Sequence, residues 1–110
     1  MLKKINRISS RKEFLEVKNK GVINYSPIFG WLSLKKDDDF KKFGFVISKK
    51  ISKRAVDRNK IKRRLAESVR KNLDAFEKGI RIVFLVKKDI LNKKMNEVEE
   101  EIYKMLGRRC

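Results

Sequence analysis

The chain has 110 residues, the usual size of one domain, and the sequence predicts a single domain over residues 1–110. Its 31 Lys and Arg residues against 14 acidic residues give a formal net charge of +17, which a compact domain retains only when a polyanion compensates it. The absence of histidine and of any long apolar run excludes histidine acid–base catalysis, Cys/His zinc sites and membrane-spanning helices.

The first predicted element is a short helix near the N-terminus. Ser10 and Glu13 have the spacing of a capping box, which places the helix start at Ser10, and Gly21 is a suitable stop. Phe14 and Val17 give the helix one apolar side. We therefore expect a short amphipathic helix that lies across a sheet.

Three extended segments follow this helix. They are Val22–Tyr25, the continuous apolar run Ile28–Leu34 and the segment Phe43–Ser48. Residues Lys35–Asp39 are predicted to form a polar hairpin connection with solvated aspartates. Adjacent carboxylates also match the oxygen ligands of a hard cation such as Mg²⁺, which is the weaker interpretation because no other ligands accompany them.

The segment from Lys49 to Lys71 is the most basic part of the chain, with 11 Lys or Arg residues against two acids in 23 residues. Apolar residues recur in it every four positions, which predicts a folded helix with one buried stripe. That stripe consists of Ile61, Leu65, Val69 and Leu73. Asp57 is the expected N-cap of a helix from Arg58 to Phe76, with a stop near Gly79. Nucleic acid is the default partner of such a helix, although an acidic protein or membrane headgroups would also neutralise it.

Two cations interrupt this apolar stripe. At about 100° per residue, Arg58 and Lys62 fall inside the stripe, one turn apart. Burying two unpaired cations costs several kcal/mol each, so the first turn cannot pack into a core. We expect this end of the helix to overhang the sheet and to face an open edge or cleft.

The C-terminal part contains one strand and one helix. Ile80–Val86 is nearly all apolar, as is typical of a central strand covered on both faces. The segment Asn92–Leu106 places its apolar side chains on one helical face and carries the main acidic cluster, so it should lie away from the polyanion. The order α-β-β-β-α-β-α predicts an α+β fold, a two-layer α-β sandwich. Cys110 cannot form an internal disulfide, which favours a reducing cytoplasm.

The segment FGFVISKKISKRAVDRNKIKRRLAESVR resembles the signature of the bacterial ribonuclease P protein subunit. The matching residues are Lys49-Lys50, Ala55-Val56, Arg58-Asn59-Lys60, Ile61 and Lys62-Arg63, with Asn6-Arg7, Glu13-Phe14, Val17 and Gly21 nearer the N-terminus. The resemblance extends to about Val86. The C-terminal helix matches the family only as the same kind of element, not through its residues.

The resemblance implies a ribosomal-protein-like fold with a left-handed βαβ crossover. It also implies an accessory role in an endoribonuclease whose RNA subunit, with Mg²⁺ bound mainly by that RNA, removes the 5′ leader of precursor tRNA. The implied partners are the catalytic RNA and precursor tRNA, with no membrane, no small-molecule substrate, no catalytic residue and no metal in the protein itself.

The resemblance assigns two groups of residues to RNA. The residues expected to contact RNA are Lys49, Lys50, Lys53, Arg54, Arg58, Asn59, Lys60, Lys62, Arg63, Arg64 and Arg70. The cleft for the single-stranded leader would contain Phe14, Val17, Lys18 and Leu32, with the start of the basic helix at its rim. Many family members have aromatic residues where this chain has Lys18 and Leu32, and Lys18 could supply a phosphate contact instead.

Three other interpretations are open from the sequence. Arg58 and Asn59 could serve only to cap the helix start through local hydrogen bonds, and the other helix cations could form a solvated face. The chain could be a ribosomal or assembly protein that binds RNA and supports no reaction. A protein-only nuclease is the third alternative, which the missing histidine and the lack of a carboxylate cluster disfavour.

Overall fold

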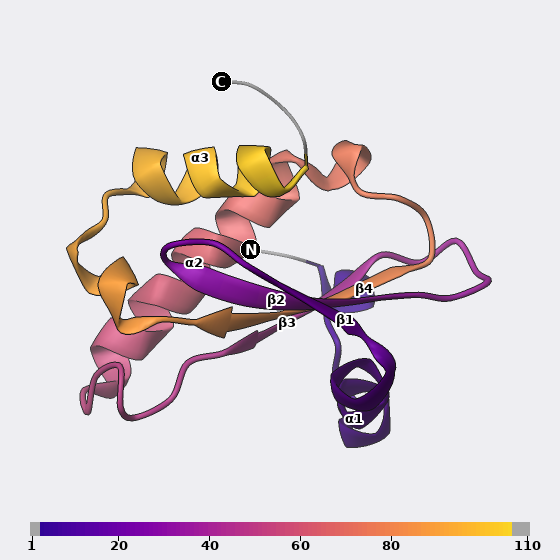
Figure 1. Ribbon diagram of the computed structural model, residues 1–110, viewed down its shortest axis with the longest axis horizontal. Coiled ribbons are helices and arrows are strands. Elements are labelled where there is room, and N and C mark those ends of the chain that lie inside the picture. Colours follow the sequence, from indigo (N-terminus) through magenta and orange to yellow (C-terminus); the bar gives the residue numbers. More distant parts are fainter. Residues whose placement is uncertain (1–2, 107–110) are drawn as a thin grey trace.

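Four strands form one sheet, and helices lie on both of its faces (Figure 1). The computed structural model describes residues 3–106. The helices are α1 (Arg11–Lys20), α2 (Ala55–Lys71) and α3 (Met95–Met105), and the strands are β1 (Val22–Tyr25), β2 (Phe29–Lys35), β3 (Lys42–Val46) and β4 (Ile80–Val86). Short 3₁₀ turns occur at Lys4–Asn6, Leu73–Ala75 and Lys88–Asn92. No helix within residues 3–106 is long and apolar enough to cross a bilayer.

Strand β4 occupies the interior of the sheet, whose order is β1-β2-β4-β3. It pairs antiparallel with β2 and parallel with β3, so the prediction of a covered central strand is confirmed. The predicted hairpin between β2 and β3 is wrong, because β4 inserts between them. The physical reason is that β4 is apolar on both faces and gains most from a place where both faces are covered.

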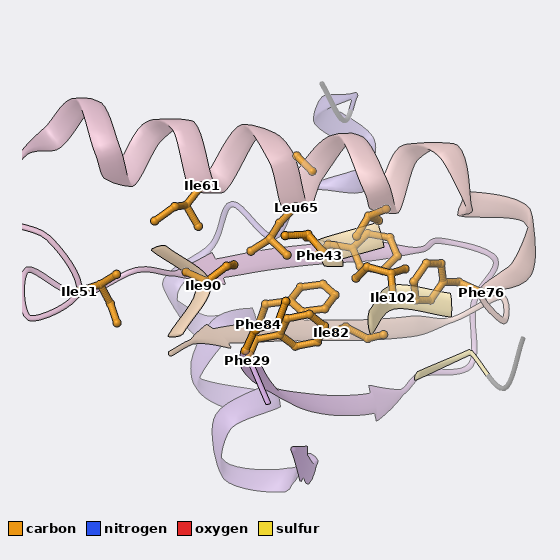
Figure 2. Packing of buried hydrophobic residues seen from close by; sticks show 14 residues of the cluster. Phe29, Phe43, Ile51, Ile61, Leu65, Phe76, Ile82, Phe84, Ile90 and Ile102 are labelled. Atoms are coloured by element: carbon orange, nitrogen blue, oxygen red, sulfur yellow. The ribbon is translucent and has the colours of Figure 1, made fainter. Parts of the chain in front are cut away.

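The larger core lies between the sheet and the pair α2 and α3 (Figures 1 and 2). Phe84 of β4 is fully buried, and its ring meets Phe29 edge-on at 5.2 Å and stacks on Phe45 at 5.4 Å. Leu65 and Val69 of α2 are both 0% exposed above these rings, as the apolar stripe predicts. The aromatic cluster therefore fixes α2 against the sheet.

Helix α1 packs against the opposite face of the sheet, where it forms a second, smaller core (Figure 1). Val17 of α1 is fully buried against Leu32 and Val83. This confirms that the first helix lies across a sheet. The α+β class and the element order are also confirmed, and α1 adds a covering element to the face that α2 and α3 leave open.

The boundaries of α2 differ from those predicted. The helix starts at Ala55, three residues before Arg58, and Asp57 lies in its first turn instead of at the N-cap. It ends at Lys71, where the Asn72 amide side chain donates to the Ser68 carbonyl at 2.8 Å. A 3₁₀ turn follows, and Gly79 adopts φ 82°, a backbone conformation that glycine favours.

Arg81 is the one charged residue in the otherwise apolar β4, and its side chain is only 3% exposed. Its guanidinium donates to the Asp38 carboxylate at 2.6 and 3.2 Å and to the Phe40 carbonyl at 3.0 Å. Glu13 of α1 lies 3.5 Å from its Nε. The aspartate run was expected to be a solvated turn, but Asp38 instead holds this buried cation and fastens the β2–β3 connection over β4.

Truncating the central ring should test the core. Phe84→Ala removes a fully buried ring with two aromatic neighbours and should lower the free energy of unfolding by about 3–5 kcal/mol. Phe40→Ala is the control, because that ring is 46% exposed and its loss should cost about 0.5 kcal/mol or less. Urea denaturation measures both. Equal losses in the two variants would contradict the assigned core.

The Arg81–Asp38 pair predicts a pH dependence. Hydrogen bonding to the guanidinium lowers the pKa of Asp38 below its ordinary value. The pair therefore stabilises the fold above the ordinary carboxyl pKa, and this stability is lost as the pH falls through the lowered pKa. Asp38→Asn should lower the urea midpoint at neutral pH, and the difference from wild type should shrink as the solution is acidified. Asp37→Asn, at an exposed neighbour, should change neither.

Candidate nucleic-acid interface

The basic residues divide into those with an acidic partner and those without. Lys35, Lys36 and Lys104 pair with Glu77, Glu16 and Glu101 respectively. Within the described chain, no ion pair forms at the exposed cations of the loop before α2 and of its first turns. These are Lys49, Lys50, Lys53, Arg54, Lys60, Lys62 and Arg63. A polyanion that approaches this end of α2 therefore meets unneutralised charge.

The loop before α2 is fastened by hydrogen bonds to the first turn of the helix. The Arg58 guanidinium donates to the Ser52 carbonyl at 2.7 Å, and the Ser52 hydroxyl donates to the Asp57 carboxylate at 3.0 Å. Ile51 anchors the same loop in the core with 8% exposure. Arg58 thus has the local hydrogen bond that the sequence offered as an alternative role, and its contact with RNA stays a prediction.

A cleft of about 530 Å³ opens between α2, strand β3 and the N-terminal segment that follows the outer edge of this strand. Its lining consists of Arg7, Ile8, Phe14, Phe43, Gly44, Phe45, Asn59, Lys62, Arg63 and Ala66. Of the two cations inside the stripe, Lys62 lines this cleft, as expected of an open edge, whereas Arg58 is not among its lining residues. The cleft joins three cationic residues to a floor that contains phenylalanine rings, which is the composition of a site for single-stranded nucleic acid.

Only part of the predicted leader cleft is accessible. Phe14 lines the cleft, and Lys18 is exposed on α1. Val17 and Leu32 were expected to contact the leader in the cleft. They are instead 0% and 8% exposed, buried between α1 and the sheet, where they hold α1 in place. The reason is that α1 directs Val17 into the sheet, directly over Leu32 and Val83.

Besides Arg58, two of the predicted RNA contacts have partners within the protein. The Arg64 guanidinium donates to the Lys93 carbonyl at 3.1 Å, which ties α2 to the segment before α3. Arg70 donates from Nε to Glu67 at 3.0 Å, and this hydrogen bonding lowers the pKa of Glu67 to about 2. These two cations are therefore partly engaged, whereas Lys60 and Asn59 remain exposed.

Arg7 and Phe45 line the cleft but were not among the predicted site residues. The N-terminal segment follows the edge of β3, where Arg7 bridges to Phe43 and the Asn6 side chain donates to the Lys41 carbonyl at 2.8 Å. This pairing joins positions 35 residues apart, so no local pattern announces it. The Asn6-Arg7 pair of the family signature was the sequence feature that could have indicated a place for Arg7 in the site.

Comparisons with known proteins point to one family. The Ribonuclease P family model matches residues 2–109. The ribonuclease P protein component of Syntrophus aciditrophicus is 34% identical over 101 residues, covering 92% of this chain and 84% of that protein. That of Dehalococcoides mccartyi is 31% identical over 107 residues, covering 97% and 87%. That of Pelotomaculum thermopropionicum is 40% identical over 67 residues, covering 61% of this chain and 59% of that protein.

Solved structures agree with the fold. The RNase P protein from Thermotoga maritima superposes with a TM-score of 0.83 at 28% identity, covering 94% of this chain and 97% of that chain. The RNase P protein of Staphylococcus aureus reaches the same TM-score at 22% identity, covering 94% of both chains, and supports the fold alone.

Removing one cleft cation should weaken binding to single-stranded RNA in a salt-dependent manner. Lys62→Met keeps the aliphatic stem but removes the charge, so the slope of log affinity against log salt should fall by about 0.7. Lys104→Met is the matched control, because Lys104 is exposed on α3 and already pairs with Glu101. Fluorescence anisotropy over a salt series measures both slopes. Identical slopes for Lys62→Met and wild type would contradict the placement of RNA in the cleft.

Proposed function

The chain belongs to the family of ribonuclease P protein components, and we propose that it assists that enzyme by binding its catalytic RNA and the 5′ leader of precursor tRNA. The observation that carries this proposal is the cleft at the start of α2, which combines Arg7, Lys62 and Arg63 with phenylalanine rings. Precursor tRNA differs from its product by the single-stranded leader, so a protein site for that strand favours substrate over product.

The two basic surfaces suit two kinds of RNA. The loop before α2 and the outer side of the helix present exposed charge, which suits the phosphates of a structured RNA. The cleft is concave and contains aromatic rings, which suits unpaired bases that can stack. We therefore assign the loop and the outer side of α2 to the catalytic RNA, and the cleft to the leader.

The hydrolysis itself is assigned to the RNA subunit with Mg²⁺. Phosphodiester cleavage needs an activated water and stabilisation of the charge on the phosphate. Within residues 3–106, no three acidic or cysteine side chains come together as a metal-ligand set. The Lys and Arg residues of the chain instead screen the repulsion between catalytic RNA and substrate. We place this reaction in the cytoplasm, because the sole cysteine cannot form an internal disulfide.

Reconstitution with the catalytic RNA tests the proposal. Adding the protein to catalytic RNA and precursor tRNA at low Mg²⁺ should accelerate leader removal, and precursor should bind more tightly than mature tRNA. Lys62→Met should reduce that preference while leaving the affinity for mature tRNA nearly unchanged, because only the leader enters the cleft. Binding without acceleration would indicate an RNA-binding protein with no part in cleavage. Leader removal by the protein alone would place the chemistry in this chain and contradict the proposal.

A further inference from the structure

The loop between β3 and α2 is anchored from inside by one apolar side chain. Residues 47–54 form this loop, and its exposed cations are Lys49, Lys50, Lys53 and Arg54. Between the two pairs of cations, Ile51 turns inward and is 8% exposed in the larger core, at the end where Ile61 of α2 lies (Figure 2). This anchor fixes one point of the loop and leaves the cations on either side to be ordered by other contacts.

Ser52, the residue after the anchor, connects the loop to the first turn of α2. Its hydroxyl donates to the Asp57 carboxylate at 3.0 Å and accepts from the Arg54 amide N–H at 3.2 Å. Its carbonyl accepts from the Arg58 guanidinium at 2.7 Å. Three hydrogen bonds of one residue therefore span the junction between the loop and the helix.

Asp57 is an acid in a surface that otherwise attracts polyanions. It is one of two acids between Lys49 and Lys71, and the other, Glu67, is bonded to Arg70. A carboxylate at this place repels phosphates and so opposes the binding of RNA. The hydrogen bond from Ser52 and the preference of a first helical turn for acids give Asp57 a role in the fold of this end of α2.

A loop that is ordered before binding raises affinity, because the partner does not have to immobilise it. Each residue of a mobile loop would lose backbone freedom when RNA holds it. With the Ser52 hydroxyl bonded on both sides, the backbone at Lys53 and Arg54 is already tied to α2. The loop cations are therefore presented together with the exposed cations of the helix.

We propose that Ser52 is a positioning residue, whose hydroxyl, held between Asp57 and the Arg54 amide, orders the cations of the loop before the catalytic RNA binds. This rests on the proposed function, in which the loop faces that RNA. Ser52 acts through the neighbouring cations. The competing role is a direct contact of its hydroxyl with RNA, which is disfavoured because the hydroxyl proton is already donated to Asp57.

Binding of the catalytic RNA over a salt series is the first test. Ser52→Ala removes only the hydroxyl and leaves the bond between Arg58 and the carbonyl, so affinity should fall about 2- to 10-fold at every salt concentration. The slope of log affinity against log salt should stay unchanged, because no phosphate contact is lost. Lys53→Met, which removes a charge from the same loop, should lower that slope by about 0.7–0.9.

Two further variants serve as rescue and control. Ser52→Thr keeps the hydroxyl and should retain the affinity of wild type. Ser48→Ala is the matched control, because this exposed serine lies in the same loop and its side chain forms no hydrogen bond within residues 3–106. Asp57→Asn keeps an acceptor oxygen for the hydroxyl and removes one charge that repels RNA, so it should bind at least as tightly as wild type.

Backbone NMR relaxation of the free protein separates positioning from contact. In wild type, the amides of residues 51–54 should have order parameters close to those of α2, about 0.85. Ser52→Ala should lower them towards the range of flexible backbone, below about 0.6, whereas Ser52→Thr, Asp57→Asn and Ser48→Ala should leave them unchanged. A hydroxyl that only contacts RNA would not affect the order of the free loop.

The outcomes separate this role from the proposed function. Unchanged order parameters in Ser52→Ala would overturn the positioning role, and a loss of affinity beside them would assign a direct contact instead. Lower order with unchanged affinity, or an equal loss of affinity in Ser48→Ala, would overturn it as well. Equal affinity of wild type for an unrelated structured RNA would contradict the proposed function, while the Ser52→Ala comparison on that RNA would still decide the positioning role. Equal urea midpoints confirm that the variants are folded.

Discussion

The buried guanidinium of Arg81 is the interaction on which the arrangement of the sheet and of α1 depends. Removing a cation from water is costly, and the cost is offset here by Asp38, by the Phe40 carbonyl and by Glu13. Two of these partners come from the connection that has to pass the start of β4, and the third comes from α1. One cation thus fixes a loop and a helix on the same strand, and Phe14, the neighbour of Glu13, is positioned for the cleft as a consequence.

The distribution of acids explains how a chain of net charge +17 folds and still presents free charge to RNA. Glu13 and Glu16 of α1 and Asp38 of the β2–β3 connection neutralise Lys42, Lys36 and Arg81 respectively. The other main group of acids lies on α3, away from the cleft. Because compensation is concentrated in these places, the loop before α2 and the start of that helix keep a dense group of exposed cations, whose mutual repulsion a polyanion relieves.

Apolar periodicity predicted the elements well, because strands and helices are decided by local burial. The four strands, the three helices and the central place of β4 all follow from runs such as Ile80–Val86. Which strands lie side by side depends on the whole fold and not on local sequence. Strands β2 and β3 are consecutive in the chain, but β4 lies between them in the sheet, and no local pattern encodes that. The role of Asp38 was missed for the same reason, since its partner Arg81 lies 43 residues away. Arg7 reaches the cleft through a similar long-range pairing with β3.

The two cations that interrupt the apolar stripe of α2 show where periodicity reaches its limit. Both were correctly excluded from a closed core, yet they escape burial in different ways. Because α2 begins three residues earlier than its apolar pattern indicates, the Ser52 carbonyl lies within reach of Arg58, and a planar guanidinium can use it without losing its charge. Lys62, one turn further, has the cleft in front of it. A cation held by a neutral carbonyl keeps its positive field, so the loop contact of Arg58 is compatible with the RNA contact predicted for it, whereas Lys62 is exposed at the cleft.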